Sequence, residues 1–125
     1  MTRDCFESYV KELYGVLADH PFEDDLVTAV FRHANNKKWF ALLMNIPASR
    51  LGIGAEDNID VANLKCPPEI AESLLGEAEG VYPAYHMNKM HWISVSIGEC
   101  EDETLLWLLE ISHSLTAKKT SKRSK

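Results

Sequence analysis

The sequence is short of the features that define many classes of protein. It has no uninterrupted apolar run approaching the ~20 residues of a membrane-spanning helix, and its first residues lack the apolar core of a secretory signal. Only three cysteines occur, and no two of them form a C-x-x-C pair, which disfavours a disulfide framework or a zinc ribbon. We therefore predict a cytoplasmic protein with free, at least half-buried thiols at Cys5, Cys66 and Cys100.

Motifs of common catalytic and cofactor-binding chemistry are also missing. There is no G-x-S-x-G motif, and the sequence pairs no serine or cysteine with a base. Gly52 and Gly54 are too few for a phosphate-binding loop. The acids expected on the first helix, Asp4, Glu7 and Glu12, are most simply a solvated face. We predict a non-catalytic protein without a cofactor or a resident metal.

Positive charge is scarce in the body of the chain. The net charge is −6, and five of the 13 basic residues lie in the last eight positions. Residues 1–117 therefore hold eight basic against 19 acidic residues, a net charge of −11. Such a body repels polyanions at long range, so nucleic-acid binding would require a local patch or the tail. The tail itself, residues 120–125, is predicted to be basic and disordered.

Length and periodicity predict one α+β domain over residues 1–119 of the 125. Helices are expected at 4–18, 68–76 and 101–118, and strands at 28–33, 39–46, 59–66 and 92–97. This order predicts two layers, in which an antiparallel sheet packs against the N- and C-terminal helices. Thr2 is the expected N-cap of the first helix. Its predicted buried stripe is Phe6, Val10, Leu13 and Leu17.

Two further elements carry specific expectations. Residues 34–38 contain two asparagines, which tolerate positive φ, and are predicted to form a tight hairpin turn. The last helix is apolar from Leu105 to Ile111, over too wide an arc for one buried face. Either a loop covers its second face or the helix meets a partner, with Trp107 as a contact of a homodimer.

The densest group of polar and aromatic residues is Pro83–Val95, hereafter the 83–95 segment. It holds two histidines, a lysine, an asparagine, a tyrosine and a tryptophan beside a β-branched strand. His86 and His91 lack the spacing of a structural zinc site, although Cys66 and Cys100 could join them if the fold allowed it. A structural role in the turn and contact with an external ligand stay open as alternatives.

Three groups of basic residues stand out in the body: Arg32, His33, Lys37 and Lys38 at the hairpin tip, Lys65 at the end of the third expected strand, and Lys89 with His86 and His91 in the 83–95 segment. Such side chains can straddle a duplex backbone while aromatic residues add stacking. Ordinary solubilising lysines on turns are the alternative. The candidate DNA- or ligand-binding residues are Arg32, Lys37, Lys38, Lys65, Tyr85, His86, Asn88, Lys89, His91 and Trp92.

Four blocks of sequence carry a resemblance to a known family. They are AVFRH at 29–33, NKKWFAL at 36–42, NLKC at 63–66 and PAYHMNKMHWI at 83–93. In this order and spacing the chain resembles the MmcQ/YjbR family of small bacterial proteins from about residue 2 to 119. The resemblance implies a CyaY-like two-layer domain, whose hairpins are described as a double wing and whose members are labelled DNA-binding.

The chain departs from the family pattern at three places. Pro67 precedes Pro68 where an aspartate is usual, so the second helix loses an N-cap carboxylate. The last helix carries Ser112 and His113 in place of Ser-Tyr. The acidic residues 99–103 do not suit a surface that faces phosphates.

These observations lead to three hypotheses. The first is weak, salt-sensitive binding of duplex DNA. The alternative is a protein-interaction or small-anion-binding domain without nucleic-acid affinity, acting through the 83–95 segment or the last helix. The third, by analogy with frataxin-like folds, is iron handling by the first helix. Convergence of the lysines on one face would favour DNA, whereas interspersed acids would disfavour it.

Overall fold

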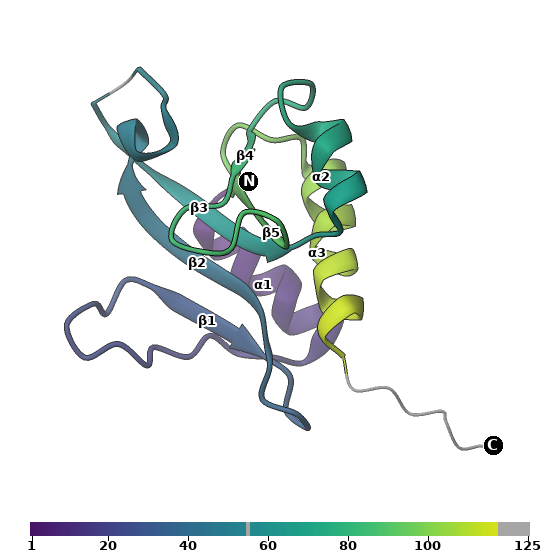
Figure 1. Ribbon diagram of the computed structural model, residues 1–125. Coiled ribbons are helices and arrows are strands. Elements are labelled where there is room, and N and C mark those ends of the chain that lie inside the picture. The colour runs from purple at the N-terminus through teal and green to yellow at the C-terminus, as the bar shows by residue number, and fades with distance from the viewer. Residues whose placement is uncertain (55, 118–125) are drawn as a thin grey trace.

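The structure is a computed structural model that describes residues 1–54 and 56–117 (Figure 1). The elements are α1 (Arg3–Tyr14), β1 (Ala29–Arg32), β2 (Trp39–Pro47), the 3-10 helix η1 (Ala48–Leu51), β3 (Asn58–Lys65), α2 (Pro68–Leu74), β4 (Val81–Pro83), β5 (Trp92–Ser96) and α3 (Asp102–Thr116). The predicted α+β class is confirmed, with an antiparallel sheet packed against the N- and C-terminal helices. The CyaY-like relationship implied by the resemblance stays a prediction.

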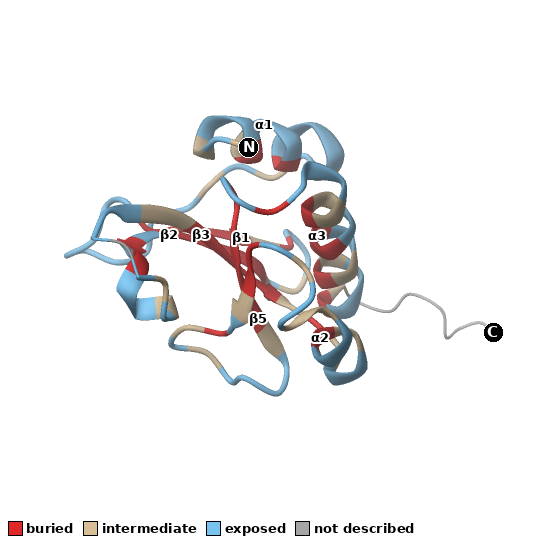
Figure 2. Cartoon of the chain, turned by 90° about the horizontal axis from the view of Figure 1, so that it is seen from above, coloured by how far each residue is buried: buried red, intermediate tan, exposed pale blue. Residues whose placement is uncertain are grey.

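The described strands form one antiparallel sheet in the order β1-β2-β3-β5-β4. Because neighbouring strands run in opposite directions, β1 and β3 end where β2 and β5 begin. Helix α1 lies on one side of this sheet, and the segment between β4 and β5 lies on the other (Figures 1 and 2). The two layers therefore leave the 83–95 segment on the face away from α1.

The central strands are buried on both faces, as the red ribbon of β2 and β3 in Figure 2 shows. On the helix side, Phe6, Phe31 and Leu105 belong to one large cluster. On the opposite face a smaller cluster consists of Val30, Leu42, Met44, Ile46 and Val61. Burial on both faces explains why residues 40–44 read as an unbroken apolar run.

Helix α1 is shorter than the sequence predicts. Thr2 is its N-cap, as expected, and its hydroxyl accepts a backbone N–H of the first turn at 3.2 Å. The helix ends at Tyr14 because Gly15 adopts a left-handed φ of 67° and caps the last turn. The prediction that Leu13 and Leu17 are buried is wrong: they are 56% and 68% exposed.

Three local expectations also need correction. Strand β4 was not predicted, because three residues are too few to show alternation. The short helix η1 was not predicted either, and it lies between the second and third expected strands. In the hairpin turn the positive φ of 65° belongs to Lys37 rather than to an asparagine. The Asn36 side chain instead bonds to α3 and to the backbone N–H of Lys38. The other boundaries agree within two residues, and the predicted tail 120–125 lies outside the described residues.

Helix α3 packs one face on the sheet and leaves part of its apolar arc outside. Leu108 and Leu109 are buried, and Leu106 lies at the margin of the core. Trp107 and Leu115 are each 47% exposed. Within the described residues, these two side chains are the part of the arc that packing inside the chain does not cover.

A serine of α3 joins the two central strands at one end of the sheet. The fully buried Ser112 accepts a hydrogen bond from the backbone N–H of Lys65 at 2.8 Å and donates to the carbonyl of Phe40 at 2.5 Å. The register of β2 and β3 extends only to Ala41 and Leu64. The Ser112 hydroxyl thus satisfies two backbone groups that would otherwise pair across the next step of the ladder.

We predict that Ser112→Ala lowers the free energy of unfolding by about 2 kcal/mol, because it leaves a buried N–H and a buried carbonyl without partners. Urea unfolding followed by circular dichroism measures this loss. Ser114→Ala, at an exposed position of the same helix, is the matched control and should change stability by less than about 0.5 kcal/mol. Equal unfolding midpoints for both variants would contradict the assignment.

Candidate functional site

The candidate cations converge on one end of the sheet, although they come from distant parts of the sequence. Arg32 is the last residue of β1, and Lys37 and Lys38 lie in the turn that follows. Lys65 is the last residue of β3 and pairs with Trp92, the first residue of β5. The antiparallel order of the strands is sufficient to bring these residues together.

Two other segments reach the same end. The carbonyl of His91 accepts the backbone N–H of Cys66 at 2.8 Å, which holds the turn before β5 against the end of β3. Helix α3 ends beside the β1–β2 turn, where the Asn36 amide donates to the carbonyl of Thr116 at 2.9 Å. We call this region the basic end; its cations are Arg32, Lys37, Lys38, Lys65 and Lys89.

The tail continues from this same end in the sequence. Thr116 is the last residue of α3, and Lys118, the first of five basic residues after it, is two positions further along the chain. Those five residues lie outside the described part of the structure.

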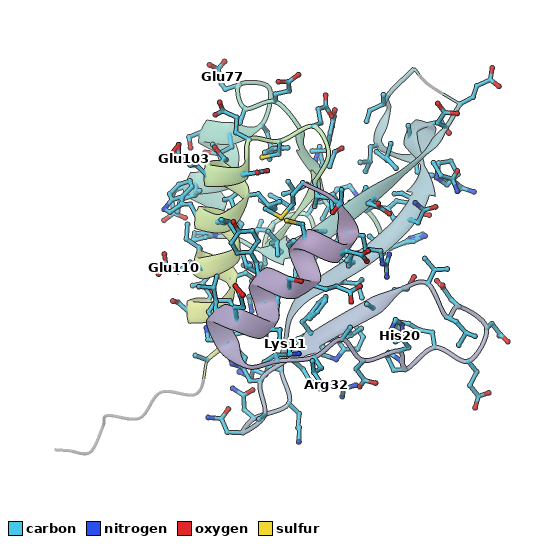
Figure 3. All side chains as sticks on the ribbon, turned by 180° about the vertical axis from the view of Figure 1, so that it is seen from behind. Lys11, His20, Arg32, Glu77, Glu103 and Glu110 are labelled. Atoms are coloured by element: carbon cyan, nitrogen blue, oxygen red, sulfur yellow. The ribbon has the colours of Figure 1, made fainter. Side chains whose placement is uncertain are left out.

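Many of the acids lie at the opposite end of the sheet. In Figure 3, Glu77 and Glu103 are at one end of the molecule and Arg32 is at the other. The acids of this end precede β3 and β4, or lie between β5 and the first turn of α3: Asp57, Glu77, Glu79, Glu99, Glu101, Asp102 and Glu103. The acidic stretch that seemed unsuited to phosphates therefore does not face the basic end.

Acids also lie near the basic end, among them Glu23 and Asp24 on the loop that packs beside Trp39. Asp19 forms an ion pair with Arg32, so this arginine is already neutralised. Glu69 stands in the first turn of α2, close enough to raise the pKa of Cys66 together with burial, the larger cause. The four lysines of the basic end have no ion pair with any described residue.

The backbone of the 83–95 segment is fixed by a buried polar network. Asn63, which is fully buried, donates its amide to the carbonyl of Tyr85 at 2.8 Å. Ser94 accepts the backbone N–H of Tyr85 at 2.8 Å and donates to the Asn63 side chain at 2.5 Å. These bonds satisfy both polar side chains and hold the segment on the sheet, so Tyr85 has a structural role.

Other candidates in this segment divide between structural and exposed positions. The Asn88 side chain accepts the N–H of Met90 at 2.8 Å, and its carbonyl accepts that of Trp92 at 3.0 Å, so Asn88 builds the turn. His86 has a left-handed φ of 59°, and its ring lies 3.9 Å from that of Tyr85. Lys89 and His91 are exposed and available to a ligand.

A metal site does not assemble from the cysteines and histidines. Among the described residues, no three His, Cys, Asp or Glu side chains group closely enough to hold a metal ion. Cys66 and Cys100 are buried, as predicted, and burial raises the pKa of the Cys66 thiol to about 11. The expectation that Cys5 is at least half buried is wrong, since it is exposed on α1.

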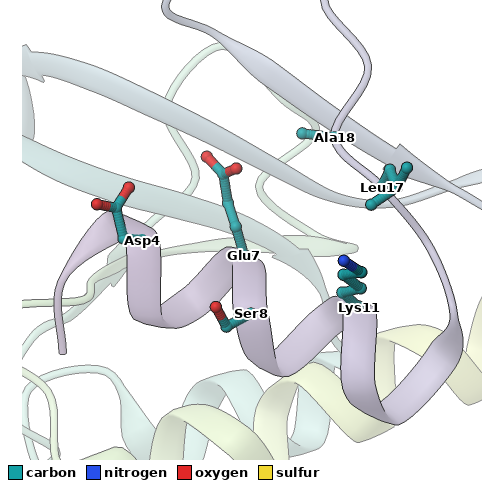
Figure 4. Close-up of a pocket in the computed structure, with 6 residues that line it drawn as sticks. All are labelled: Asp4, Glu7, Ser8, Lys11, Leu17 and Ala18. Atoms are coloured by element: carbon teal, nitrogen blue, oxygen red, sulfur yellow. The ribbon is translucent and has the colours of Figure 1, made fainter.

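Two acids of the iron-handling hypothesis, Asp4 and Glu7, project from α1 (Figure 4). Asp4 and Glu7 line a shallow hollow of about 280 Å³ together with Lys11. Glu7 also forms an ion pair with Arg3, at 3.4 Å between nitrogen and oxygen. Glu12 does not line this hollow. The acids thus share their surroundings with two cations, which suits a solvated face better than an iron site.

A pair of histidines near the basic end was not predicted as a unit. His33, taken from the sequence as part of the basic hairpin tip, is instead only 7% exposed and bonds to Thr116 at 2.9 Å. Its ring lies 4.4 Å from that of His113, which stacks on Tyr14 at 3.8 Å. Burial lowers the pKa of both histidines, and the neighbouring His33 lowers that of His113 further.

The described residues thus form a two-layer α+β domain with a group of lysines at one end of its sheet. The family model YjbR matches residues 11–115, and the chain belongs to the YjbR family, which confirms the resemblance found in the sequence. In the described residues no helix has the length and apolar character needed to cross a bilayer.

Relatives and solved structures agree with this assignment. The uncharacterised protein YyaQ of Bacillus subtilis is 42% identical over 117 residues, which cover 93% of this chain and 98% of that protein. A crystal structure from Pseudomonas syringae is 44% identical, covers 94% of this chain and 100% of its own, and has a TM-score of 0.90. Deinococcus radiodurans protein DR2400 is 29% identical with a TM-score of 0.69, covering 98% of this chain and 83% of its own.

We predict that stability falls as the pH drops below about 6.5, the pKa of an unfolded histidine. The folded-state pKa values of His33 and His113 are lowered, so the unfolded chain binds more protons in this window. The contribution of the two histidines to the free energy of unfolding is fully present above pH 6.5. It is lost as the pH falls from there through their lowered folded-state pKa values, at up to about 1.4 kcal/mol per pH unit for each histidine. Urea unfolding at a series of pH values measures the slope.

The control for this prediction separates the buried pair from the exposed histidines. His113→Phe should flatten the dependence, because one titrating group is removed while the ring packing is kept. His91→Gln, at an exposed position, should leave the slope unchanged. An unaltered slope in His113→Phe would show that this histidine does not titrate as its burial requires.

Proposed function

We propose that this protein is a non-catalytic, cytoplasmic DNA-binding protein that contacts the phosphates of duplex DNA through its basic end. The observation that carries the proposal is the convergence of Lys37, Lys38, Lys65 and Lys89 on one end of the sheet. A point charge at the end of a flexible lysine can neutralise a phosphate without reading a base.

The distribution of charge supports this orientation. The net charge of residues 1–117 is −11, yet many of the acids gather at the far end of the sheet (Figure 3). A polyanion therefore meets the molecule with its basic end first, because the opposite end is repelled. The five basic residues of the tail extend the same positive region in sequence.

The geometry also supports weak binding without strong sequence preference. Arg32, the arginine of the basic end, is paired with Asp19 and is not free for a bidentate contact with guanine. Lys37 and Lys38 are exposed on the β1–β2 hairpin, and Lys89 and His91 are exposed on the loop before β5. We propose that these two projections act as the double wing that the resemblance implies.

Fluorescence anisotropy with a labelled duplex, from about 50 to 200 mM salt, tests the proposal. The log-log salt slope should fall by about one for each phosphate-contacting lysine removed, hence by about two in Lys37→Ala with Lys38→Ala. Arg50→Ala in η1, which follows the opposite end of β2, removes an exposed cation away from the basic end and is the control. No binding at the lowest salt, or the same loss of slope in the control, would refute the proposal.

A specific observation favours a second, compatible contact. Trp107 and Leu115 are each 47% exposed on α3, where the alternative hypothesis expects a protein partner. We propose a homodimer through this face. Sedimentation equilibrium should give a mass near twice 14.1 kDa that Trp107→Glu reduces to the monomer. A monomer for the unmodified protein would rule out this contact without affecting DNA binding.

A further inference from the structure

A groove lies on the face of the sheet that the helices do not cover. Its volume is about 790 Å³. Its floor is formed by β2, with Trp39, Leu42 and Met44. One wall is the loop Pro21–Asp25, and the other is the start of the 83–95 segment. The size and the apolar floor are those of a site for a small molecule.

The loop wall combines an aromatic anchor with negative charge. Phe22 packs edge-on against Trp39, with ring centroids 6.1 Å apart and planes at 90°, so the indole is held in place at the groove. Glu23 and Asp24 follow on the rim as exposed carboxylates. Neither makes an ion pair with a described residue. An indole face beside free carboxylates is a site for a cation.

The shape of this wall is set by the next acid, Asp25. Its carboxylate accepts the backbone N–H groups of Val27 and Thr28 at 3.0 and 2.9 Å, and it also bonds to the Thr28 hydroxyl. These bonds lower the pKa of Asp25. The loop is therefore closed by an acid that remains ionised, and the two preceding carboxylates are left to face the solvent and the groove.

The opposite wall is also held in place before any ligand arrives. His86 and Met87 line it, and Met87 packs against the apolar cluster of this sheet face. The residue before them, Tyr85, has its backbone fixed by the buried side chains of Asn63 and Ser94. Both walls are thus anchored to the sheet, so little ordering is required on binding.

No lysine or arginine is among the described residues that line the groove. We propose that it binds a small organic cation, with an ammonium group near the indole of Trp39 and the carboxylates of Glu23 and Asp24. An aromatic or branched apolar body would rest on the side chains of β2 and on Met87. This site borders the basic end, because Trp39 directly follows Lys38 in the sequence, but its ligand and its test do not depend on DNA binding.

Three probes with one apolar body test the choice of charge: 2-phenylethylammonium, 2-phenylethanol and 3-phenylpropionate. Binding is followed by NMR, from the indole N–H of Trp39 and the methyl groups of Met44 and Met87. The ammonium probe should bind at least about fivefold more tightly than the alcohol, and the carboxylate most weakly. Equal affinities, tighter binding of the carboxylate, or no shift with any probe would overturn the proposal.

A matched pair of variants assigns the effect to the rim. Glu23→Gln with Asp24→Asn should weaken the ammonium probe about fivefold and leave the alcohol unchanged. Glu56→Gln with Asp57→Asn removes the same charge from another exposed loop and should change neither. Both double variants alter exposed side chains, so both should fold, and circular dichroism is the measurement that checks this. The same loss in both, or in neither, would also contradict the assignment.

Discussion

The need to cover both faces of β2 and β3 is the constraint on which the rest of this structure depends. Helix α3 covers one face and inserts Ser112 between the ends of these strands. The 83–95 segment lies over part of the other face, where Asn63 and Ser94 satisfy the backbone of Tyr85. The 83–95 segment, which looks like a ligand site in the sequence, is therefore first a structural cover of the sheet. Its exposed positions are the ones that remain available for function.

The same topology separates the charges. A chain with a body charge of −11 is a poor partner for DNA only if its charges are mixed evenly. In an antiparallel sheet, segments far apart in sequence end together, so Lys38 and Lys65 share one end while Glu77 and Glu103 lie at the other (Figure 3). Composition alone cannot express this arrangement, because it depends on the directions of the strands.

Much of the fold could be predicted from sequence, because periodicity and caps are local signals. The N-cap at Thr2 and the strand that begins at Trp92 were predicted correctly, and the family resemblance was confirmed. The groove could not be predicted, since its walls are 60 residues apart and meet only across β2. The role of His33 was also missed, because a hairpin tip is usually exposed and here α3 covers it.

The most direct test of the central claim is to map the DNA contact on the protein by NMR during a titration with a short duplex at low salt. The account predicts shifts at Lys37, Lys38, Lys65 and Lys89, and none around Glu77 or at residues 99–103. The shifts should reverse when salt is added. Shifts centred on the acidic end, or spread evenly over the surface, would contradict the claim that the basic end is the binding surface.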